Sequence, residues 1–268
     1  MAAKRVTIGG VTVGGETLCL IAGPCAVESE EVVFGAAEAV SAVRDKYKIP
    51  VIFKSSYMKA NRLSGQSFAT IGIGKALSIL EEVKRRFDLP VLTDIHSVEE
   101  IDMAADVADC LQIPAFLCRQ TELVVAAAKK KLPLNIKKGQ FMAPEDMELI
   151  AEKALSVGND QVMLTERGTS FGYRDLVVDF RGLVIMAGFG FPVIFDCTHS
   201  VQRPGASGGS SGGDARFIMP LARAAVAVGV DAVFVETHPD PPNALSDKDC
   251  QLPTEKLPEL VESILAVK

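Results

Sequence analysis

The residues of this chain that are best suited to chemistry stand at the ends of short apolar runs. Eight such runs each contain or lead into a polar or ionisable side chain: Cys25, Lys54, Asp94, Gln112, Lys137, Glu166 with Arg167, Asp196 with His199, and Glu236. Thiol, imidazole and carboxylate groups are common ligands of transition metals, whereas lysine and arginine bind phosphate and carboxylate anions. If these run ends meet in space, they form a site with both kinds of chemistry.

A regular alternation of elements would bring the run ends together. The apolar runs cover residues 18–22, 51–53, 91–93, 110–113, 134–136, 162–165, 193–195 and 232–235. The segments with a helical pattern cover residues 29–47, 70–87, 98–105, 119–131, 146–157, 174–187, 213–228 and 254–267. Strands and helices that alternate eight times predict an α/β protein, a (β/α)8 TIM barrel, in which active sites lie at the carboxyl ends of the strands.

Two segments lie outside this repeat. Residues 5–18 alternate apolar and polar side chains around two Gly-Gly pairs, which predicts an N-terminal β-hairpin at the bottom of the barrel. Residues 203–214 are rich in Gly and Ser and follow the seventh strand, on the side where a barrel keeps its chemistry. Two interpretations of this segment stay open: a flexible connector, and a loop that closes over the active site.

Length and composition favour a single domain over residues 1–268. The chain has 268 residues, of which 48% are hydrophobic, and a formal net charge of -6. The negative charge argues against nucleic acid or an acidic membrane surface as the main partner. The first residues lack the apolar core of a signal peptide, no membrane-length apolar run occurs, and the six Cys lack the spacing of a disulfide framework. We therefore expect a cytoplasmic protein with free thiols.

Barrel closure predicts a metal site. The first strand of a closed barrel neighbours the eighth and the eighth neighbours the seventh, so Cys25, Glu236 and His199 follow three adjacent strands, and Asp247 lies in the loop after the eighth. This mixed set of sulfur, nitrogen and oxygen donors suits Zn, Fe(II), Mn or Co better than Mg or Ca. The alternative is that Cys25 is a small buried apolar residue, as we expect of the other five Cys. Two further histidines are interpreted as hydrogen-bonded or packing residues: His96 and His238.

The second feature of the strand ends is a concentration of cations: Lys54, Lys59, Arg62, Arg119, Lys137, Lys138 and Arg167. Like charges at the poorly solvated mouth of a barrel repel one another unless an anion compensates them. Arginine binds phosphate oxygens in a bidentate manner, and lysine contributes a point charge. The sequence therefore predicts a small phosphorylated metabolite as the substrate.

These segments resemble the 3-deoxy-D-manno-octulosonate-8-phosphate synthases along nearly the whole chain. The resemblance rests on IAGPCAVESE (21–30), FKSSYMKANR (53–62), TDIH (93–96), LQIPAFLCRQTEL (111–123), NIKKGQF (135–141), LTERGTSFGY (164–173), DCTHSVQ (196–202) and VETHPDPPNALSD (235–247). Related 3-deoxy-heptulosonate-7-phosphate synthases typically carry Lys-Pro-Arg where this chain has Lys59-Ala60-Asn61-Arg62, which favours arabinose 5-phosphate over erythrose 4-phosphate. Cys in the first-strand motif is typical of the metal-dependent branch of the family.

The resemblance also implies a role for each candidate residue. The metal ligands of the family correspond to Cys25, His199, Glu236 and Asp247. Its phosphoenolpyruvate site corresponds to Lys54, Lys59, Gln112, Lys137 and Arg167, and its sugar-phosphate site to Asn61, Arg62, Ser64 and Arg119. Arg119 resembles an arginine that reaches a neighbouring subunit's site, which implies a homo-oligomer, in this family a tetramer. The candidate catalytic residues are Lys59, His199 and Asp247, and the general base stays unassigned.

One loop departs from the family pattern. The family commonly reads Ala-Asn-Arg-Ser-Ser-Ile-His-Ser-Phe-Arg-Gly, whereas residues 60–70 read Ala-Asn-Arg-Leu-Ser-Gly-Gln-Ser-Phe-Ala-Thr. A serine that contacts the sugar phosphate is therefore Leu63 here, and a later arginine is Ala69. Ser64 and Gln66 are the candidates to replace the lost contacts.

The implied reaction condenses phosphoenolpyruvate with D-arabinose 5-phosphate and water into 3-deoxy-D-manno-octulosonate 8-phosphate and phosphate, a step of lipopolysaccharide inner-core sugar biosynthesis. Three alternatives stay open. The first is a heptulosonate-7-phosphate synthase that uses erythrose 4-phosphate. The second is a Schiff-base aldolase with Lys54 or Lys137 as the amine. The third is a non-enzymatic protein that binds phosphorylated metabolites.

Overall fold

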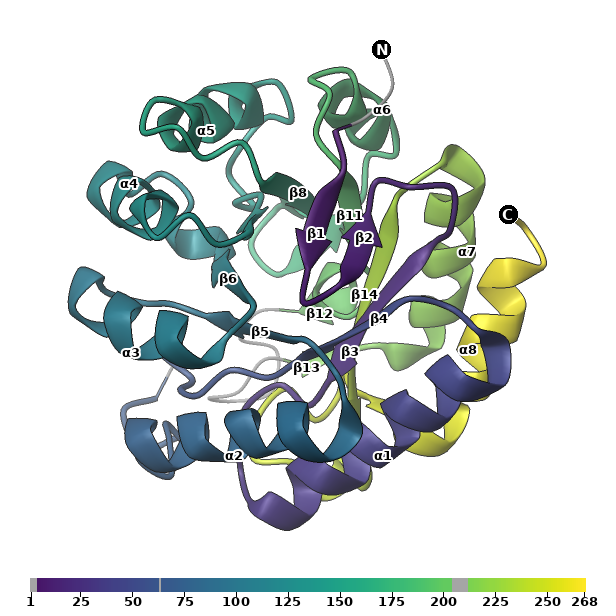
Figure 1. Ribbon diagram of the computed structural model, residues 1–268. Helices are drawn as coiled ribbons and strands as arrows, with labels where there is room; N and C mark the ends of the chain where they lie inside the picture. The colour runs from purple at the N-terminus through teal and green to yellow at the C-terminus, as the bar shows by residue number, and fades with distance from the viewer. Residues whose placement is uncertain (1–3, 63, 204–211) are drawn as a thin grey trace.

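A closed ring of parallel strands forms the centre of the molecule (Figure 1). The computed structural model describes residues 4–62, 64–203 and 212–268. The ring consists of β3 (Cys19–Gly23), β4 (Val51–Lys54), β5 (Val91–Asp94), β6 (Cys110–Ile113), β7 (Leu134–Lys137), β8 (Val162–Glu166), β11 (Val193–Asp196) and β14 (Ala232–His238). Because β14 pairs in parallel with both β11 and β3, the ring closes. The predicted (β/α)8 barrel is confirmed.

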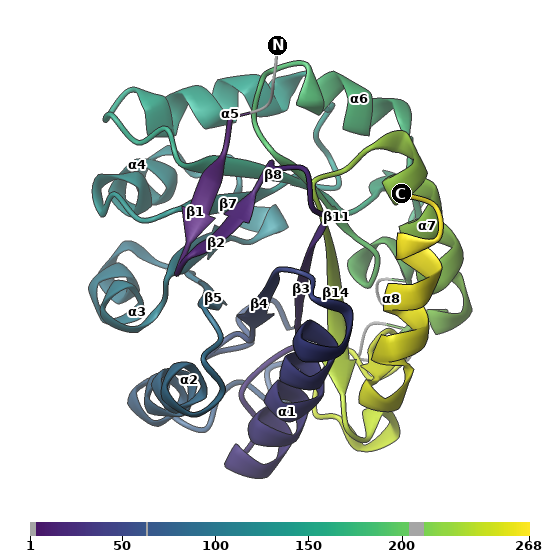
Figure 2. The ribbon, with the colours of Figure 1, turned by 45° about the vertical axis from the view of Figure 1, so that its right-hand side comes forward.

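Helices cover the outside of the ring (Figures 1 and 2). They are α1 (Glu30–Tyr47), α2 (Ile73–Phe87), α3 (Ile101–Val107), α4 (Thr121–Lys129), α5 (Asp146–Leu155), α6 (Arg181–Ala187), α7 (Ile218–Val228) and α8 (Leu257–Leu265). Every residue of the eight barrel strands is buried, because helices pack on one side of the wall and the barrel interior fills the other. Strands that are buried on both faces appear in the sequence as uninterrupted apolar runs, and those runs made them recognisable.

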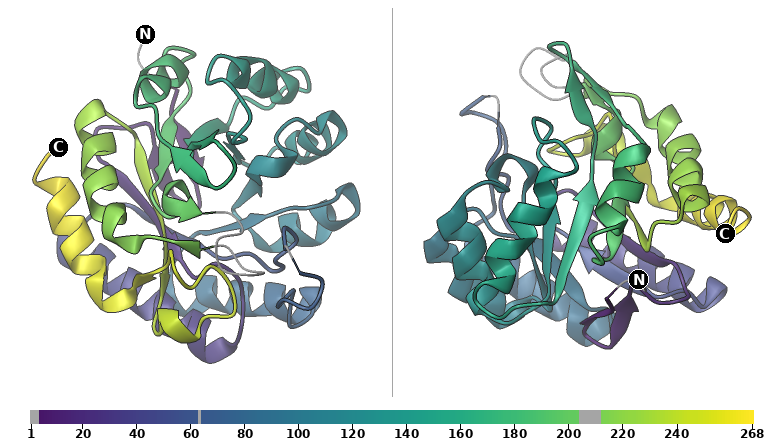
Figure 3. Two further views of the ribbon diagram at one scale, coloured as in Figure 1. Left: turned by 180° about the vertical axis from the view of Figure 1, so that it is seen from behind. Right: turned by 90° about the horizontal axis from the view of Figure 1, so that it is seen from above.

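The predicted N-terminal hairpin is present and closes one end of the barrel. It consists of β1 (Val6–Ile8) and β2 (Val11–Val13), joined by Gly9 and Gly10, whose φ angles of 51° and 89° suit a two-residue turn. Val6, Ile8 and Val13 are buried in one cluster with inward-facing residues of the strands. The hairpin lies at one end of the molecule, at the end of the barrel opposite to the carboxyl ends of the strands (Figure 3, right). The loop end therefore stays open for a site.

One helix prediction is wrong over half of its length. Residues 174–187 were expected to be helical, but α6 begins only at Arg181. The preceding residues form an antiparallel hairpin of β9 (Thr169–Phe171) and β10 (Asp175–Val177). Gly172 supplies the turn with a φ angle of 69°. β-Branched and aromatic residues at alternating positions favour this strand pair over a helix.

The other predicted helices differ only at their ends. Gly72 has a φ angle of 102°, outside the helical region, so α2 starts at Ile73 rather than at residue 70. Short 3-10 turns precede α3, α7 and α8 at Val98–Glu100, Ala215–Phe217 and Thr254–Lys256. At the two ends of the glycine-rich segment, β12 (Gln202–Arg203) pairs with β13 (Gly212–Gly213). Residues 204–211 of this segment lie outside the described residues, as does Leu63 in the loop after β4. Among the helices described, none has the length and apolar character needed to cross a membrane.

Candidate active site

A cavity of about 260 Å³ opens at the carboxyl ends of the barrel strands. Figure 3 (left) views the molecule from this end, opposite to the hairpin. Its polar and charged lining consists of Cys25, Lys54, Ser56, Lys59, Asn61, Asp94, His96, Lys137, Gln140, Arg167, His199 and Glu236. Met58 and the loop at 114–117 supply most of its apolar wall. Polar residues from seven of the eight apolar runs therefore share one space, and Gln112 is the exception.

The four predicted metal ligands lie together at this cavity. One ligand atom each from Cys25, Glu236 and Asp247 lies within 4.8 Å of the other two. Cys25 Sγ is 3.3 Å from Asp247 Oδ2. His199 Nε2 is 3.7 Å from Glu236 Oε1 and 3.9 Å from Asp247 Oδ2. These four residues meet because β14 lies between β3 and β11, as barrel closure required.

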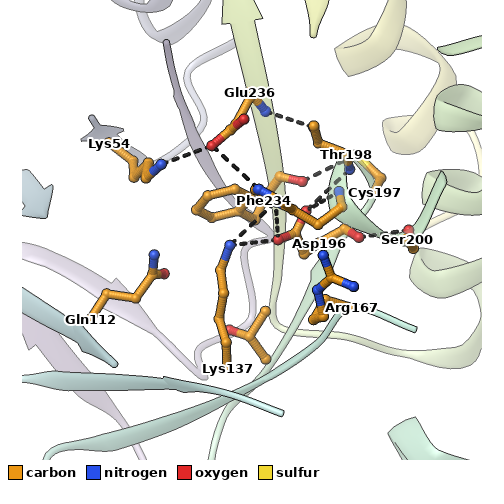
Figure 4. Close-up of polar contacts among 12 residues, drawn as sticks. Lys54, Gln112, Lys137, Arg167, Asp196, Cys197, Thr198, Ser200, Phe234 and Glu236 are labelled. Atoms are coloured by element: carbon orange, nitrogen blue, oxygen red, sulfur yellow. Dashed lines mark hydrogen bonds and ion pairs between the residues drawn. The ribbon is translucent and has the colours of Figure 1, made fainter. Parts of the chain in front are cut away.

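Asp196 fixes the orientation of the histidine in this group. Its Oδ2 lies 2.7 Å from His199 Nδ1, and its Oδ1 accepts the backbone N–H groups of Thr198 and His199 at 3.1 and 2.9 Å. Figure 4 shows Asp196 at the centre of these contacts. The imidazole is thereby held with Nε2 toward Glu236 and Asp247. A carboxylate behind the distal nitrogen is the usual arrangement for a metal-binding histidine.

The donor set fits a divalent cation on its chemistry as well as on its distances. The Oε2 atom of Glu236 is buried and has no hydrogen-bond partner among the described residues. A buried carboxylate oxygen without a partner is unfavourable, and a bound cation would supply the missing partner. One sulfur, one imidazole nitrogen and two carboxylates suit a transition metal of borderline softness.

Three lysines of the cavity pair with acids, two with carboxylates of the donor set and one with Asp196. Lys59 Nζ lies 3.2 Å from Cys25 Sγ and forms an ion pair with Asp247. Lys54 Nζ bonds Glu236 Oε1 at 2.8 Å and lies 3.6 Å from Asp94 Oδ2. Lys137 Nζ bonds Asp196 Oδ2 at 2.6 Å. Figure 4 shows Lys54 and Lys137 pointing toward the space between Glu236 and Asp196. The cations predicted for anion binding thus also neutralise the predicted metal site.

Burial and neighbouring charges set the protonation of the donor groups. Burial, with Glu236 adding to it, raises the pKa of the Cys25 thiol well above its usual value. Burial also opposes the charge of Asp247, but Lys59 and His199 outweigh it and hold the pKa of that carboxyl below its ordinary value. The Asp247 carboxylate is therefore ready to act as a ligand, whereas the thiol must lose its proton when a metal binds.

Gln112 lies in the wall of the barrel rather than at the cavity surface. Its amide nitrogen donates to Asp94 Oδ1 at 2.6 Å, and its Oε1 accepts from Asn135 at 2.7 Å. Thr165 then donates to Asn135 Oδ1 at 2.7 Å. This ladder of hydrogen bonds crosses four neighbouring strands. The side-chain amide of Gln112 is occupied by its hydrogen bonds to Asp94 and Asn135. Gln112 therefore holds Asp94 in place and does not line the cavity.

The predicted sugar-phosphate residues are less closely gathered than the metal ligands. Asn61 lines the cavity, and the next residue, Arg62, is exposed and donates to the carbonyl groups of residues 65 and 67 in its own loop. Ser64 is half-buried in the same loop. Arg119 is exposed after β6 and does not line the cavity. Within one chain, Asn61 is the member of this group that reaches the cavity.

Arg167 has an unused donor in the cavity. Its Nη2 donates to Gln202 Oε1 at 2.9 Å, but its buried Nη1 has no partner among the described residues. Burial lowers the pKa of the guanidinium against the effect of nearby carboxylates. Gln140 Oε1, also on the cavity wall, is likewise buried without a partner in the described chain. A bound anion would satisfy Arg167 Nη1 with a charge-assisted hydrogen bond.

Sequence reasoning left four wall residues without a function, Ser56, Asp94, His96 and Gln140, and likewise Asp196, which lies behind His199. Asp94 and Asp196 end apolar runs, and that position was the signal that they face the site. His96 packs edge-on against Tyr57 with ring centroids 5.4 Å apart, and it lines the cavity. His238 is buried and accepts from the Asp240 backbone at 2.9 Å.

The fold and this cavity define a barrel enzyme that acts on small anionic substrates. The family model of the DAHP synthetase I family matches residues 3–266, so the chain belongs to that family.

Curated relatives match over almost the full chain, and those named here share the name 2-dehydro-3-deoxyphosphooctonate aldolase. The protein of Geotalea uraniireducens is 52% identical over 265 residues, which cover 98% of this chain and 97% of that protein. The protein of Brucella anthropi is 51% identical over 264 residues, covering 98% of this chain and 95% of that protein. The protein of Magnetococcus marinus is 50% identical over 268 residues, covering 100% and 93%.

The unpaired donor of Arg167 predicts an anion site that can be tested without turnover. We expect Arg167→Gln to weaken the binding of inorganic phosphate about 10-fold or more, because a hydrogen bond to a charged group is lost. Isothermal titration calorimetry measures the change. Arg181→Gln is the matched control, since Arg181 is 87% exposed and pairs with Asp179 on the surface. Equal phosphate affinity in wild type and Arg167→Gln would contradict the prediction.

Proposed function

We propose that this protein condenses phosphoenolpyruvate with D-arabinose 5-phosphate and water to give 3-deoxy-D-manno-octulosonate 8-phosphate and inorganic phosphate. The name shared by relatives at 50–52% identity supports this reaction, which serves lipopolysaccharide inner-core sugar biosynthesis. The observation that carries the proposal is the cavity itself, where Lys54, Lys59, Lys137 and Arg167 meet the donor set of Cys25 and its partners. Two anionic reactants and one cation require such a combination.

The chain's own cations bind and orient the reactants. Lys59, Lys137 and Arg167 hold the phosphate and carboxylate groups of phosphoenolpyruvate, with Lys54 beside them. The methylene carbon is then placed next to the aldehyde carbon of the sugar phosphate, and Asn61 contributes to the position of the sugar. The carbon–carbon bond forms between these two atoms. Water adds to the carbon that bears the phosphate, and loss of phosphate leaves the keto group.

A divalent ion, Zn, Fe(II), Mn or Co, is part of the proposal, with Cys25, His199, Glu236 and Asp247 as the residues that hold it. When bound, the ion supplies Lewis-acid polarisation of an aldehyde or water oxygen. Asp196 keeps the His199 ring in the orientation that directs Nε2 to this site. Lys59 contacts both Cys25 and Asp247. It therefore connects the proposed metal site to the proposed phosphoenolpyruvate site.

The Schiff-base alternative fits the site poorly. A lysine nucleophile must be neutral, which requires a lowered pKa. Burial opposes the charge of Lys54, yet Glu236 and Asp94 outweigh it and raise the pKa of its ammonium group. The other candidate amine, Lys137, is held in its ion pair with Asp196. Both lysines are therefore arranged as fixed cations.

We further propose that the reaction takes place in the cytoplasm. All six Cys are buried free thiols, and reducing compartments preserve thiols.

A homo-oligomer, a tetramer, completes the proposal, with Arg119 acting in a neighbouring subunit's sugar-phosphate site. Arg119 is exposed at the open end of the barrel and does not line the cavity of its own chain. Large apolar side chains on the loops and hairpin around this end are also exposed: Phe116 54%, Phe141 56% and Phe171 71%. Exposed aromatic groups of this kind are typical of subunit interfaces.

The choice of aldose can be measured by release of inorganic phosphate from phosphoenolpyruvate. We expect a kcat/KM with arabinose 5-phosphate about 10-fold or more above that with erythrose 4-phosphate, because the shorter aldose leaves part of the site unfilled. Preference for erythrose 4-phosphate would instead assign the heptulosonate-7-phosphate reaction. Saturable phosphate binding without turnover of either aldose, in the presence of divalent metal, would favour the non-enzymatic alternative.

The metal proposal predicts that chelation abolishes activity and that a divalent ion restores it. Cys25→Ala should lose turnover and weaken metal binding more than about 100-fold, since second-shell changes alone often cost 10- to 100-fold. Metal content by atomic spectroscopy provides a readout that is independent of activity. Cys197→Ala is the control, because Cys197 Sγ contacts the Phe234 carbonyl rather than the donor set. Full activity of rigorously metal-free protein would reject the ligand assignment.

The shared site predicts complementation between two inactive proteins. Arg119→Ala and Cys25→Ala should each have little activity alone, but subunit mixing should restore part of it, because hybrid oligomers contain sites with both residues intact. Activity after mixing and partial unfolding with refolding is compared with each variant treated alone. If Arg119 acts within its own chain, mixed samples will show no gain.

A further inference from the structure

The residue that follows Lys137 is a second lysine with a different environment. Successive residues at the end of a strand point to opposite sides, so Lys137 faces the cavity and Lys138 turns away from it. Lys138 is only 1% exposed and is absent from the cavity lining. Its place in the predicted group of anion-binding cations is therefore wrong. A buried ammonium group requires compensation by charge and hydrogen bonds, and its partners indicate what it does.

Lys138 joins the loops that follow β7 and β8. Its Nζ lies 3.4 Å from Glu166 Oε1, at the end of β8, and 3.0 Å from Thr169 Oγ1, at the start of β9. It also contacts the carbonyl oxygens of Gly139 and Met142, at 3.5 and 3.4 Å. The glutamate is as well buried as the lysine, with side-chain exposures of 3% and 1%. The pair thus connects two neighbouring loops beneath the surface.

Glu166 in turn fixes the backbone beside it. Its Oε1 accepts the N–H groups of Arg167 at 3.0 Å and Gly168 at 2.7 Å. Gly168 has a φ angle of 91°, and a Cβ added there would lie 3.3 Å from the Leu176 side chain. The backbone conformation of this turn therefore suits glycine at position 168, and the Glu166 carboxylate stabilises the turn. Arg167 stands within this turn, and its guanidinium reaches the cavity.

We infer that Lys138 and Glu166 form a buried ion pair that positions Arg167 for the anionic substrate, without touching the substrate themselves. Replacement of a buried ion pair by apolar residues is often neutral for stability, so stability alone does not account for this pair. Its contacts end on the loops that follow β7 and β8, and Arg167 stands in the second of these loops. The inference rests on the proposed function only in treating the cavity anion as phosphate or phosphoenolpyruvate.

A double-mutant cycle with Arg167 separates positioning from a structural role. Lys138→Met keeps the length of the side chain and removes its charge. In wild-type background we expect it to weaken inorganic phosphate binding and to raise the KM for phosphoenolpyruvate about 10-fold, with kcat nearly unchanged. In the Arg167→Gln background the same change should have no further effect on phosphate affinity, because the group that Lys138 positions is already absent.

Calorimetry with inorganic phosphate measures the four proteins of the cycle, and thermal unfolding checks that each is folded. Lys131→Met is the control, since Lys131 is exposed and bonds the Val157 carbonyl before β7 and β8 begin, at the opposite ends of these strands from Lys138 and Glu166. Thr169→Val removes one hydrogen-bond acceptor of Lys138 and provides a milder variant, for which we expect the same non-additivity with a shift of about 3-fold. Thr169→Val tests the positioning role of Lys138 if Lys138→Met does not fold.

An equal loss of phosphate affinity in both backgrounds, or no loss in wild type, would overturn the inference. The cycle does not require turnover. If the wild-type protein binds phosphate but fails to condense phosphoenolpyruvate with arabinose 5-phosphate, the proposed function is rejected while the positioning role is still decided by the binding data.

Discussion

Charge compensation at the mouth of the barrel is the constraint on which the rest of the site depends. Buried carboxylates and lysines are tolerated there because each lysine contacts an acid: Lys54 with Glu236, Lys59 with Asp247, and Lys137 with Asp196. A divalent cation alone, or a phosphate-bearing anion alone, would disturb this balance. Added together they would offset part of each other's charge, so binding of both would carry a lower electrostatic cost than binding of either one alone.

The barrel makes this balance possible by bringing together parts of the chain that are far apart in sequence. Cys25 follows the first barrel strand, whereas Glu236 and Asp247 follow the last, and β14 pairs with both β3 and β11. The hairpin fills the opposite end with apolar side chains, which leaves one end for polar groups. Distances of a few ångströms between the donors therefore depend on closure of the ring rather than on any local motif.

The sequence predicted the parts of the molecule that depend on strand periodicity. The barrel, the hairpin and the meeting of Cys25, His199 and Glu236 all follow from buried runs with a polar end. The residue pattern did not distinguish which of two adjacent lysines faces the cavity, because the last residue of a strand cannot be identified to within one position, and only the family resemblance selected Lys137. It also assigned residues 174–180 to a helix, although the turn at Gly172 and strand pairing with β9 decide that segment.

The site has two parts: a floor, formed by residues on barrel strands, and a rim, formed by residues on loops. Lys54, Lys137 and Glu236 belong to barrel strands, and the ladder from Asp94 to Thr165 holds the wall between them. Asn61, Arg62 and Asp247 stand on loops, where backbone geometry varies more easily. Under the proposed function, the floor contributes Lys54 and Lys137 to the phosphoenolpyruvate site, whereas the rim contributes Asn61 and Arg62 to the aldose site. A change of aldose would therefore require changes in the loops rather than in the barrel strands.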